Sequence, residues 1–425
     1  MKQADNSNAG SGNYKWFLLL FLWVAFFLHQ GTRQIYNAIL PQIQDSFGVT
    51  SLKMGIVGTV FTLTYGLCAP FAGIASDFLR RKWMLIAGLA VFCAGIFLSG
   101  WVSSIGLMIV FYGLLNGAGQ GFYYPPACSL LGQLHEDTRA TALAIHQTAL
   151  YAGIVICSCV SGLFAEIPAE TICGAHLDGW RMPFIIFGGI GLLWAFMLVF
   201  LMRDTKPVAN PSGSDKASLK DALLVVVRKP SAIMLALGFG MMIYVDCGFK
   251  TWMPAFLQEH FGMKAATAAT NAVIWHYIGA FFGVMLGGRI TDKMAKTRKT
   301  VRFEANIAGL VIGAPFILLT AQAGTPALCF AGMLLFGFFR GVYDSNLFAS
   351  LFDVVAPRYR ASASGLMLCF GFVIGSSSPM VLGWIRDNSG MGAAIASLSG
   401  FYLVGGLLIF LARTFFFARD YETSK

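Results

Sequence analysis

Long runs of apolar residues, separated by short polar segments, make up most of the chain. A helix needs about 20 mostly apolar residues to cross the hydrocarbon core of a membrane. Runs of about this length predict twelve membrane-spanning helices, at 16–40, 55–76, 83–102, 105–131, 140–166, 181–202, 232–258, 267–288, 303–322, 326–352, 361–385 and 392–417. The first run is longer than the apolar part of a cleaved signal peptide, so we expect it to remain as a membrane helix.

One long polar segment interrupts this pattern near the middle of the chain, at 203–229. Its Pro, Ser, Gly and charged residues predict a solvated linker, with a short amphipathic helix at 218–227. Six predicted spans precede it and six follow. We therefore expect an N-terminal six-helix bundle at 1–202, a cytoplasmic linker at 203–230 and a C-terminal six-helix bundle at 231–425.

Composition makes lipid the main solvent of this protein. Of 425 residues, 57% are hydrophobic and only 12% are charged, too few to cover the surface of a soluble chain of this length. The net charge of +10 does not indicate a nucleic-acid partner, because the basic residues lie in gaps between apolar runs and form no basic stripe. The nine cysteines are scattered without metal-ligand spacing, so we expect no metal site.

The distribution of Lys and Arg predicts the orientation in the membrane. If both termini are cytoplasmic, 23 of the 30 basic side chains lie in cytoplasmic segments and four in outside loops. Short cytoplasmic loops carry such an excess of positive charge. We therefore expect a multi-pass protein of a plasma membrane, of the bacterial inner-membrane type, with both termini cytoplasmic, and we expect it to be a monomer.

The two halves carry related motifs after their second spans. The first copy contains Gly73 and Asp77, followed by Arg81 and Lys82. The second contains Gly288 and Asp292, so the two glycines lie 215 residues apart. A glycine allows two helices to approach closely, and an acid at a helix end can pair with arginines or cap a neighbouring helix. We expect these residues to form conformational latches.

Two further pairs of sites support the repeat. Arg139 begins the sequence RATA between spans four and five, and Arg360 begins RASA between spans ten and eleven. We assign both arginines to the latches. Pro41 and Pro254 are expected to close spans one and seven, because proline disrupts a helix.

Twelve spans, a central linker and the repeated loop motif resemble the major facilitator superfamily over essentially the whole chain. The family's loop reads Gly-x-x-x-Asp-Arg-x-Gly-Arg-Arg/Lys, whereas this chain has Phe78 for the first arginine and Arg80 for the second glycine. The second copy is looser. The resemblance implies two pseudo-symmetric six-helix bundles that rock about a site at mid-membrane, with helices 1, 4, 7 and 10 lining the cavity.

Five ionisable residues fall deep within the predicted spans. They are Arg33 in span one, Asp246 and Lys250 in span seven, and Arg340 and Asp344 in span ten. An uncompensated arginine at a helix centre is unfavourable by about 2.5–3.5 kcal/mol on insertion scales, so it normally faces a cavity or a partner. The resemblance makes all three of these helices cavity-lining, so these five residues are candidates for the substrate path.

Two interpretations of these charges remain open. Asp246 and Lys250 are one helical turn apart, as are Arg340 and Asp344, so each pair is able to neutralise itself locally. Arg33 has no acid in its own span and occupies the position equivalent to Asp246 in the repeat, eight residues before a proline. We therefore expect Arg33 to bind an anionic substrate, because its guanidinium group matches a carboxylate or phosphate.

Other polar residues share these helices. Gln120, Tyr123 and Tyr124 in span four offer hydrogen bonds and aromatic faces that suit a polyhydroxylated ring, although aromatic residues are also common membrane anchors. Asn37 lies one turn beyond Arg33 and is expected to share its face. With Lys250 and Arg340, these residues complete the predicted substrate site.

The eight-residue step from Arg33 to Pro41 resembles organophosphate:phosphate antiporters and the anion:cation symporters that carry sugar acids and sialic acid. The phosphate antiporters have a second arginine where this chain has Asp246, which favours a singly charged carboxylate here. The sugar-acid symporters often use a glutamate in span four, where this chain has Gln120. If a proton gradient drives transport, Asp246 is then the leading candidate to carry the proton, and Asp344 is the alternative. Span one and the loop after span two also resemble spinster-like lysolipid transporters.

Other function classes fit less well. A non-transporting membrane sensor would not need five charges in a cavity. A membrane enzyme would need clustered His, Asp or Cys, whereas the six histidines are dispersed. His146 and His276 lie within spans and are candidates for sensing protons, although packed, hydrogen-bonded histidines are more common at such positions. Without a phosphate-binding loop, ATP is not the expected energy source. We therefore expect a transporter without a bound cofactor rather than an enzyme.

Overall fold

The computed structural model describes residues 8–135, 138–167, 170–172, 175–203 and 228–422. Most of the predicted linker, including its expected helix at 218–227, lies outside these residues. Within the described residues, twelve helices are long and apolar enough to cross a membrane. The predicted fold class, an all-α membrane protein with twelve transmembrane helices, is therefore confirmed.

The N-terminal half supplies six of these spans, and several of them are built from more than one helical segment. Its helices are α1 (Asn8–Ala38), α2 (Leu40–Phe47), α3 (Ser51–Phe78), α4 (Arg81–Ser99), α5 (Ile105–Met108), η1 (Ile109–Asn116), α6 (Gly117–Gly121), α7 (Tyr124–Leu134), α8 (Arg139–Ala165), η2 (Gly179–Arg181) and α9 (Met182–Leu201). A short antiparallel pair of strands, β1 (Glu170–Ile172) and β2 (Ala175–Leu177), lies between α8 and η2 and was not predicted.

The C-terminal half supplies the other six spans, most of them with longer helices. They are α11 (Pro230–Phe261), α12 (Ala265–Ala295), α13 (Val301–Gln322), α14 (Pro326–Val354), η3 (Pro357–Tyr359), α15 (Arg360–Ser376), α16 (Ser378–Ser389), α17 (Met391–Leu411), η4 (Ala412–Phe416) and α18 (Phe417–Glu422). The hydroxyl of Thr325 caps the start of α14 by accepting a hydrogen bond from the Leu328 amide over 3.4 Å.

The two prolines that the repeat singled out behave differently. Pro41 lies in the first turn of α2, directly after the break that ends α1 at Ala38, as predicted. Pro254 does not close span seven, because α11 continues through it to Phe261. Every residue of α11 from Thr251 to Leu257 is buried, so tertiary packing supports the helix across the missing backbone donor.

Helices α12 and α14 pack against each other along most of their length. Small residues allow this close approach: a Cβ atom at Gly283 would collide with the carbonyl oxygen of Phe338, and one at Gly341 with that of Ala280. Membrane helices commonly pack through such small residues, because lipid provides no hydrophobic force to drive them together. The contact matters for the site, since it brings side chains of α12 next to Arg340 of α14.

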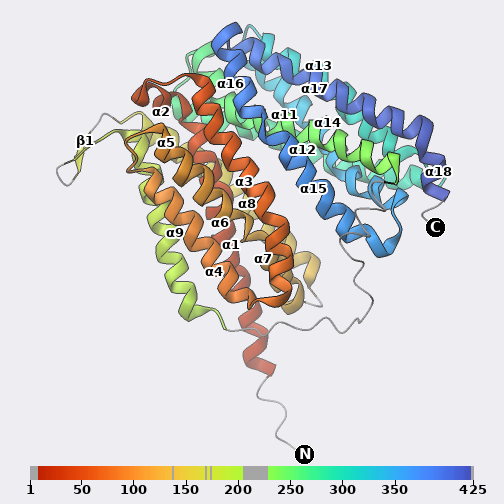
Figure 1. Ribbon diagram of the computed structural model, residues 1–425, viewed down its shortest axis with the longest axis horizontal. Helices are drawn as coiled ribbons and strands as arrows, with labels where there is room; N and C mark the ends of the chain where they lie inside the picture. Colours follow the sequence, from red (N-terminus) through yellow and green to blue (C-terminus); the bar gives the residue numbers. More distant parts are fainter. Residues whose placement is uncertain (1–7, 136–137, 168–169, 173–174, 204–227, 423–425) are drawn as a thin grey trace, which may run out of the picture.

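The two halves meet at one end of the molecule, near α2, α3 and α16, and diverge towards the other end, where α1 begins and α18 ends (Figure 1). At the joined end, the carboxylate of Asp387 on α16 accepts hydrogen bonds from the amides of Ser51 and Leu52 over 3.0 and 2.9 Å. Asp387 thus caps the first turn of α3 from the opposite half. We call this end the sealed end.

Two further polar contacts join the halves at the sealed end. Gln42 of α2 donates a hydrogen bond to Gln258 of α11 over 2.7 Å. Arg386 of α16 donates to Gln44 of α2 over 2.7 Å and also pairs with Glu259 of α11. The Gln42–Gln258 and Arg386–Gln44 bonds cross between the halves, so separating the bundles here requires breaking them together, whereas the Arg386–Glu259 pair lies within the C-terminal half.

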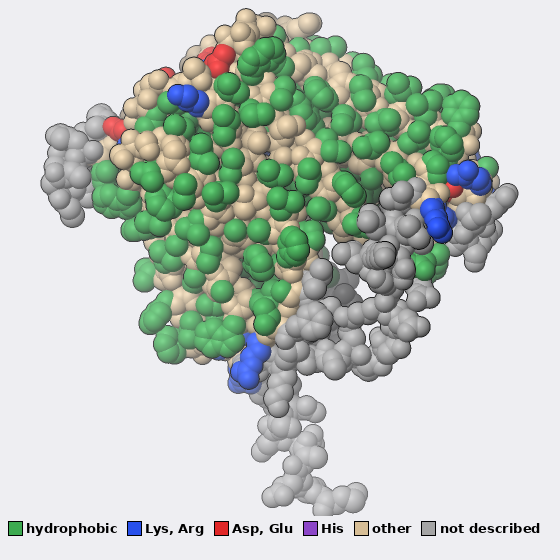
Figure 2. Space-filling view, viewed as in Figure 1, with side chains coloured by type: hydrophobic (Ala, Val, Ile, Leu, Met, Phe, Trp, Pro, Cys, Tyr) green, Lys and Arg blue, Asp and Glu red, His purple; other side chains and the backbone are tan. Residues whose placement is uncertain are grey.

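Hydrophobic side chains cover the middle of the face shown in Figure 2, whereas the visible Lys, Arg, Asp and Glu side chains lie towards its edges. Large apolar residues such as Phe71, Phe200 and Phe415 are more than 60% exposed. Such a surface is stable in lipid rather than in water. The protein is therefore an integral, multi-pass membrane protein.

We predict that Asp387→Ala loosens the start of α3, because it removes the carboxylate that accepts the Ser51 and Leu52 amides. Loss of a helix cap weakens such a turn by about 1 kcal/mol, so hydrogen exchange at these amides should accelerate about fivefold. Mass spectrometry of the peptide around residues 49–56 measures this exchange. Asn388→Ala is the matched control, because Asn388 is exposed and bonds within α16. Equal exchange in both variants would contradict the cap.

Candidate functional site

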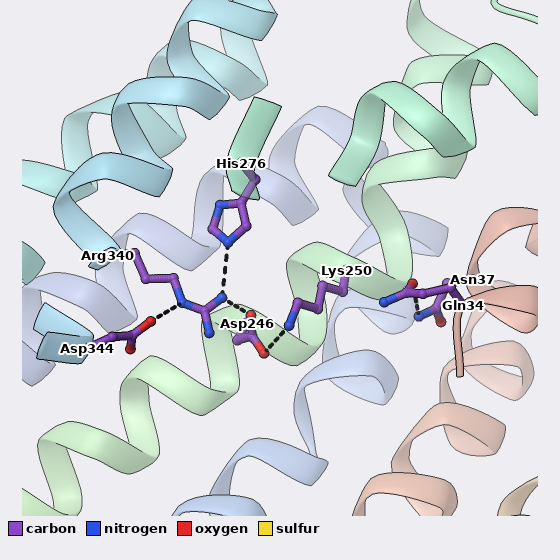
Figure 3. Close-up of polar contacts among 7 residues, drawn as sticks. All are labelled: Gln34, Asn37, Asp246, Lys250, His276, Arg340 and Asp344. Carbon is purple, nitrogen blue, oxygen red and sulfur yellow. Dashed lines mark hydrogen bonds and ion pairs between the residues drawn. The ribbon is translucent and has the colours of Figure 1, made fainter. Parts of the chain in front are cut away.

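A network of charged side chains lies between α11 and α14, close to the middle of both helices. Asp246 of α11 is its centre. One carboxylate oxygen accepts a hydrogen bond from Lys250 over 2.9 Å, one turn along the same helix, and the other accepts from Nη1 of Arg340 on α14 (Figure 3). The side chain of Asp246 is 14% exposed. A carboxylate this deep in a membrane protein is stabilised by two cations at once.

Arg340 holds this network together from α14. Besides its bond to Asp246, its Nε lies 3.4 Å from Asp344 one turn along α14. Its Nη1 also lies 3.1 Å from Nε2 of His276, which α12 contributes (Figure 3). Two acids, a lysine and an arginine therefore form a set whose formal charges cancel when all four are ionised.

Asp344 is the most accessible member of the network. Its side chain is 35% exposed, compared with 13% for Arg340. Its contact with Arg340 is an ion pair rather than a hydrogen bond, since the buried Nε has no hydrogen-bond partner among the described residues. The charge of Asp344 is therefore held by one ion pair, whereas that of Asp246 is held by two hydrogen-bonded cations.

Arg33 of α1 stands apart from these pairs. Its guanidinium carbon lies 4.6 Å from the ring centre of Tyr65 and 5.2 Å from that of Phe61, both on α3. Among the described residues, no acid lies within ion-pair distance of it. Tyr112 of η1 donates a hydrogen bond to its backbone carbonyl over 3.0 Å. Arg33 is thus a partly buried cation that contacts aromatic faces.

The other predicted site residues of α1 and span four differ in how exposed they are and in whether their side chains are already hydrogen-bonded. Asn37 is partly exposed and donates to Gln34 over 3.1 Å. Gln120 is fully buried and bonds to Thr32 and Asn116.

The two tyrosines of span four that the sequence assigned to the site, Tyr123 and Tyr124, differ in the same way. Tyr123 is 1% exposed and donates to the carbonyl of Leu22, whereas Tyr124 is 37% exposed. In this conformation Gln120 and Tyr123 therefore bond within the N-terminal half, while Asn37 and Tyr124 present accessible surface.

The predicted latch residues of the first half are only partly described. The side chains of Asp77 and Arg139 lie outside the described part of the structure. Lys82 is buried and donates to the carbonyls of Val199 and Met202 over 2.7 and 2.6 Å, so it caps the end of α9. Arg81 is likewise buried.

In the second half, Arg360 donates to the carbonyl of Phe352 over 3.0 Å and so caps the end of α14. Asp292 is 74% exposed and lies 3.4 Å from Arg302. A Cβ at Gly73 would meet nothing within 4 Å among the described residues, and one at Gly288 would make an ordinary contact with Ser345.

Four members of the network, Asp246, Lys250, Arg340 and Asp344, were candidates from the sequence, but the bond that joins the two pairs was not predicted. Both local pairs are present, but the bond between Arg340 and Asp246 joins them into one set. The sequence left His276 open between proton sensing and a packed, hydrogen-bonded role; its side chain is buried, and its Nε2 contacts Arg340. The signal available was its place within a predicted span, together with the glycine-rich spacing of α12 that brings this helix against α14.

The fold and the buried charges define the class: a polytopic membrane protein with a polar site between its helices. The family model of the Major Facilitator Superfamily matches residues 22–379. The chain therefore belongs to this superfamily of transporters, and the expectation that it is a transporter rather than an enzyme is confirmed.

Individual relatives are similar over most of the chain. Protein spinster of Drosophila melanogaster is 25% identical over 398 residues, which cover 88% of this chain and 62% of the fly protein. The hexuronate transporter of Bacillus subtilis is 24% identical over 409 residues, which cover 92% of each protein. This chain thus spans less than two thirds of the fly protein's length but nearly all of the bacterial one.

Solved structures share the fold. A bacterial homolog of the human lysosomal transporter Spinster, in an inward-facing and occupied conformation, aligns with a TM-score of 0.80 at 19% identity, over 96% of this chain and 98% of that one. The nucleoside transporter NupG aligns with a TM-score of 0.71 at 15% identity, over 93% and 99% of the two chains. At these identities the likeness is evidence for the fold alone.

We predict that Asp246→Asn destabilises the protein more than Asp344→Asn. The first change leaves Lys250 without its acid and weakens the hold on Arg340, whereas the second removes a single 3.4 Å ion pair. Removing one partner of a buried pair is unfavourable by about 3 kcal/mol. Thermal unfolding of both purified variants in the same detergent measures the difference. A lower unfolding temperature for Asp344→Asn would contradict the central position of Asp246.

Proposed function

We propose that this protein is a secondary active transporter that moves a small organic anion, a sugar-acid or sialic acid-like carboxylate, by alternating access coupled to a proton gradient. One observation carries the proposal: Arg33 is a partly buried cation without an acid in ion-pair distance among the described residues, beside a network whose charges cancel. An anion that bound Arg33 would supply the missing charge.

The surroundings of Arg33 support this role. An arginine packed on two aromatic rings is held in place while its planar group still has hydrogen-bond donors to offer. Asn37 and Tyr124 are accessible enough to contact hydroxyl groups of a sugar ring. Gln120 and Tyr123 would have to exchange their present bonds to do so. Lys250 and Arg340 would bind substrate only after releasing Asp246.

A carboxylate fits this site better than a phosphate. A doubly charged phosphate group would be expected to meet a second free cation, but the equivalent position on α11 carries Asp246. The similarity to a hexuronate transporter over nearly the full length of both proteins supports the same choice.

The proposed proton coupling involves Asp246 or Asp344. Asp246 keeps two cationic partners in this conformation, which favours its ionised form. Asp344 has one weaker contact and more accessible surface, so we favour Asp344 as the acid that takes up a proton here. Asp246 would take up a proton after Asp344, once substrate has drawn Arg340 away from Asp246.

The proposed membrane arrangement follows from the positive-inside rule. With both termini in the cytoplasm of a bacterial-type inner membrane, the sealed end faces outward and the conformation described here is open to the cytoplasm. Rocking the halves would break the Asp387 contacts and the bond from Arg386 to Gln44 at the sealed end. Contacts around Asp77, Arg139, Asp292 and Arg360 would then form on the cytoplasmic side. The transporter is proposed to act as a monomer.

A spinster-like lysolipid substrate is the second candidate, because the fly spinster protein is also similar over most of this chain. A zwitterionic headgroup would place its phosphate on Arg33. The two candidates are separated by testing whether unlabelled lysophosphatidylcholine or unlabelled D-galacturonate inhibits uptake of labelled D-glucuronate. A sugar-phosphate antiporter and a non-transporting sensor are the remaining alternatives; the first predicts phosphate exchange and the second no uptake.

We predict that Arg33→Ala abolishes uptake of labelled D-glucuronate into proteoliposomes, and that Arg33→Lys reduces it severely, because lysine keeps the charge but loses the two-pronged contact. The lost aromatic contact should affect stability by about 1 kcal/mol or less, so both variants should remain folded. Arg298→Ala is the matched control, since Arg298 is exposed and pairs with Glu304 away from the site. Normal uptake by Arg33→Ala would refute the proposal.

We predict that neutralising the coupling acid separates exchange from accumulation. Asp344→Asn mimics a permanently protonated side chain, so it should still exchange labelled for unlabelled D-glucuronate across the liposome membrane. It should no longer concentrate substrate when a proton gradient is imposed. Asp246→Asn is tested in parallel. The acid whose variant still accumulates substrate is not the coupling site, and accumulation by both variants would exclude the proposed coupling.

A further inference from the structure

The contact between His276 and Arg340 constrains the protonation of the histidine. An arginine guanidinium group only donates hydrogen bonds. The 3.1 Å contact between Arg340 Nη1 and His276 Nε2 is therefore a hydrogen bond only when Nε2 carries no proton and accepts. His276 must then be neutral, with its hydrogen on Nδ1.

The surroundings of His276 make this constraint strong. The side chain is 3% exposed, and its Nδ1 has no hydrogen-bond partner among the described residues. The rings of Phe249 and Phe336 pack beside it, with centroids 5.8 and 5.0 Å away. A second proton on this ring would bring two cations into contact in a largely apolar setting, where water screens them poorly.

The charged groups around His276 come from two helices. Among the described residues, Arg340 of α14 and Asp246 and Lys250 of α11 are the charged groups that act on it electrostatically. Tyr277 is its neighbour on α12, and Tyr151 of α8 packs against Tyr277 at 5.8 Å. Asp246 is the acid in this group, and Nη1 of Arg340 contacts both Asp246 and the histidine ring.

We propose that His276 and Arg340 form a proton-dependent switch within the substrate site: a proton on His276 and the bond from Arg340 to its Nε2 exclude each other. Protonation of His276 breaks its bond with Arg340 and offers Asp246 a new cationic partner. Asp246 keeps Lys250 as well, so Arg340 is released as a second cation for an anionic substrate. An anion that draws Arg340 away makes protonation of His276 easier in turn.

This switch deepens the proposed function and rests on it for the identity of the anion. Because binding effects are reciprocal, a proton that favours anion binding must itself be favoured by the anion. The switch therefore links one proton to one anion at the binding step. His276 acts here as a positioning residue for Arg340, and Asp246 or Asp344 can still carry the transported proton.

The first test needs no substrate. Nitrogen NMR of protein labelled at histidine, in lipid, identifies the tautomer and follows its titration; His276 is assigned as the signal coupled to an arginine nitrogen. We expect the Nδ1–H tautomer at pH 7.5. In Arg340→Gln, which imitates removal of the arginine, His276 should become protonated about one pH unit or more above the wild-type value. An Nε2–H tautomer, or identical titrations, would overturn the switch.

The second test measures the linkage with D-glucuronate, whose carboxylate is ionised at both pH values used. In wild-type protein, the Kd should weaken about tenfold between pH 5.5 and 7.5. His276→Gln keeps an acceptor for Arg340 but cannot titrate, so its Kd should change by less than about twofold. The matched control is His146→Gln, a buried histidine of α8 outside the network, which should keep the wild-type slope.

The results distinguish the switch from the proposed function. A full pH dependence in His276→Gln overturns the switch, and its loss in Asp344→Asn alone assigns the dependence to that acid. Failure of wild-type protein to bind D-glucuronate counts against the proposed substrate class. The NMR titration then still decides whether His276 and Arg340 compete for the proton.

Discussion

Charged side chains inside a membrane protein need either an opposite charge or a polar surface, and this requirement organises the whole site. Lys250, Arg340, Asp246 and Asp344 satisfy one another, so their helices are tied together at mid-depth. Arg33 meets aromatic faces instead of an acid. In the proposed function, the unbalanced cation beside a balanced network is what selects an anionic substrate.

The packing of the helices determines which side chains of the network contact one another. Close approach through Gly283 and Gly341 brings α12 against α14, so that His276 reaches Arg340. The sealed end places α3 against α16, with Asp387 capping a helix that belongs to the other half. These two kinds of contact differ in their consequences. The first lies within one half and can persist during rocking, whereas the second must break whenever the sealed end opens.

Much of this was predictable from the sequence, for a simple physical reason. The length and apolar composition of membrane spans allow their number and approximate positions to be predicted. A charged residue such as Arg33 or Asp246 is easily recognised within an apolar run. The sequence could not show that Arg340 reaches across to Asp246, because that depends on the separation and rotation of two helices. The predicted end of span seven at Pro254 was wrong for a similar reason, since packing of the buried residues around Pro254 keeps α11 continuous where proline alone predicts a break. The sequence also could not choose between packing and proton sensing for His276, because a histidine within a span has the same pattern in both cases.

The central claim is that Arg33 takes the charge of the substrate. A structure of the protein with bound D-glucuronate, determined by electron cryo-microscopy in lipid nanodiscs, tests it most directly. The account predicts the carboxylate at hydrogen-bond distance from the Arg33 guanidinium group, about 2.8 Å, with the sugar ring between the two halves. A bound ligand whose carboxylate lies on Lys250 or elsewhere, leaving Arg33 on its aromatic rings, would contradict it.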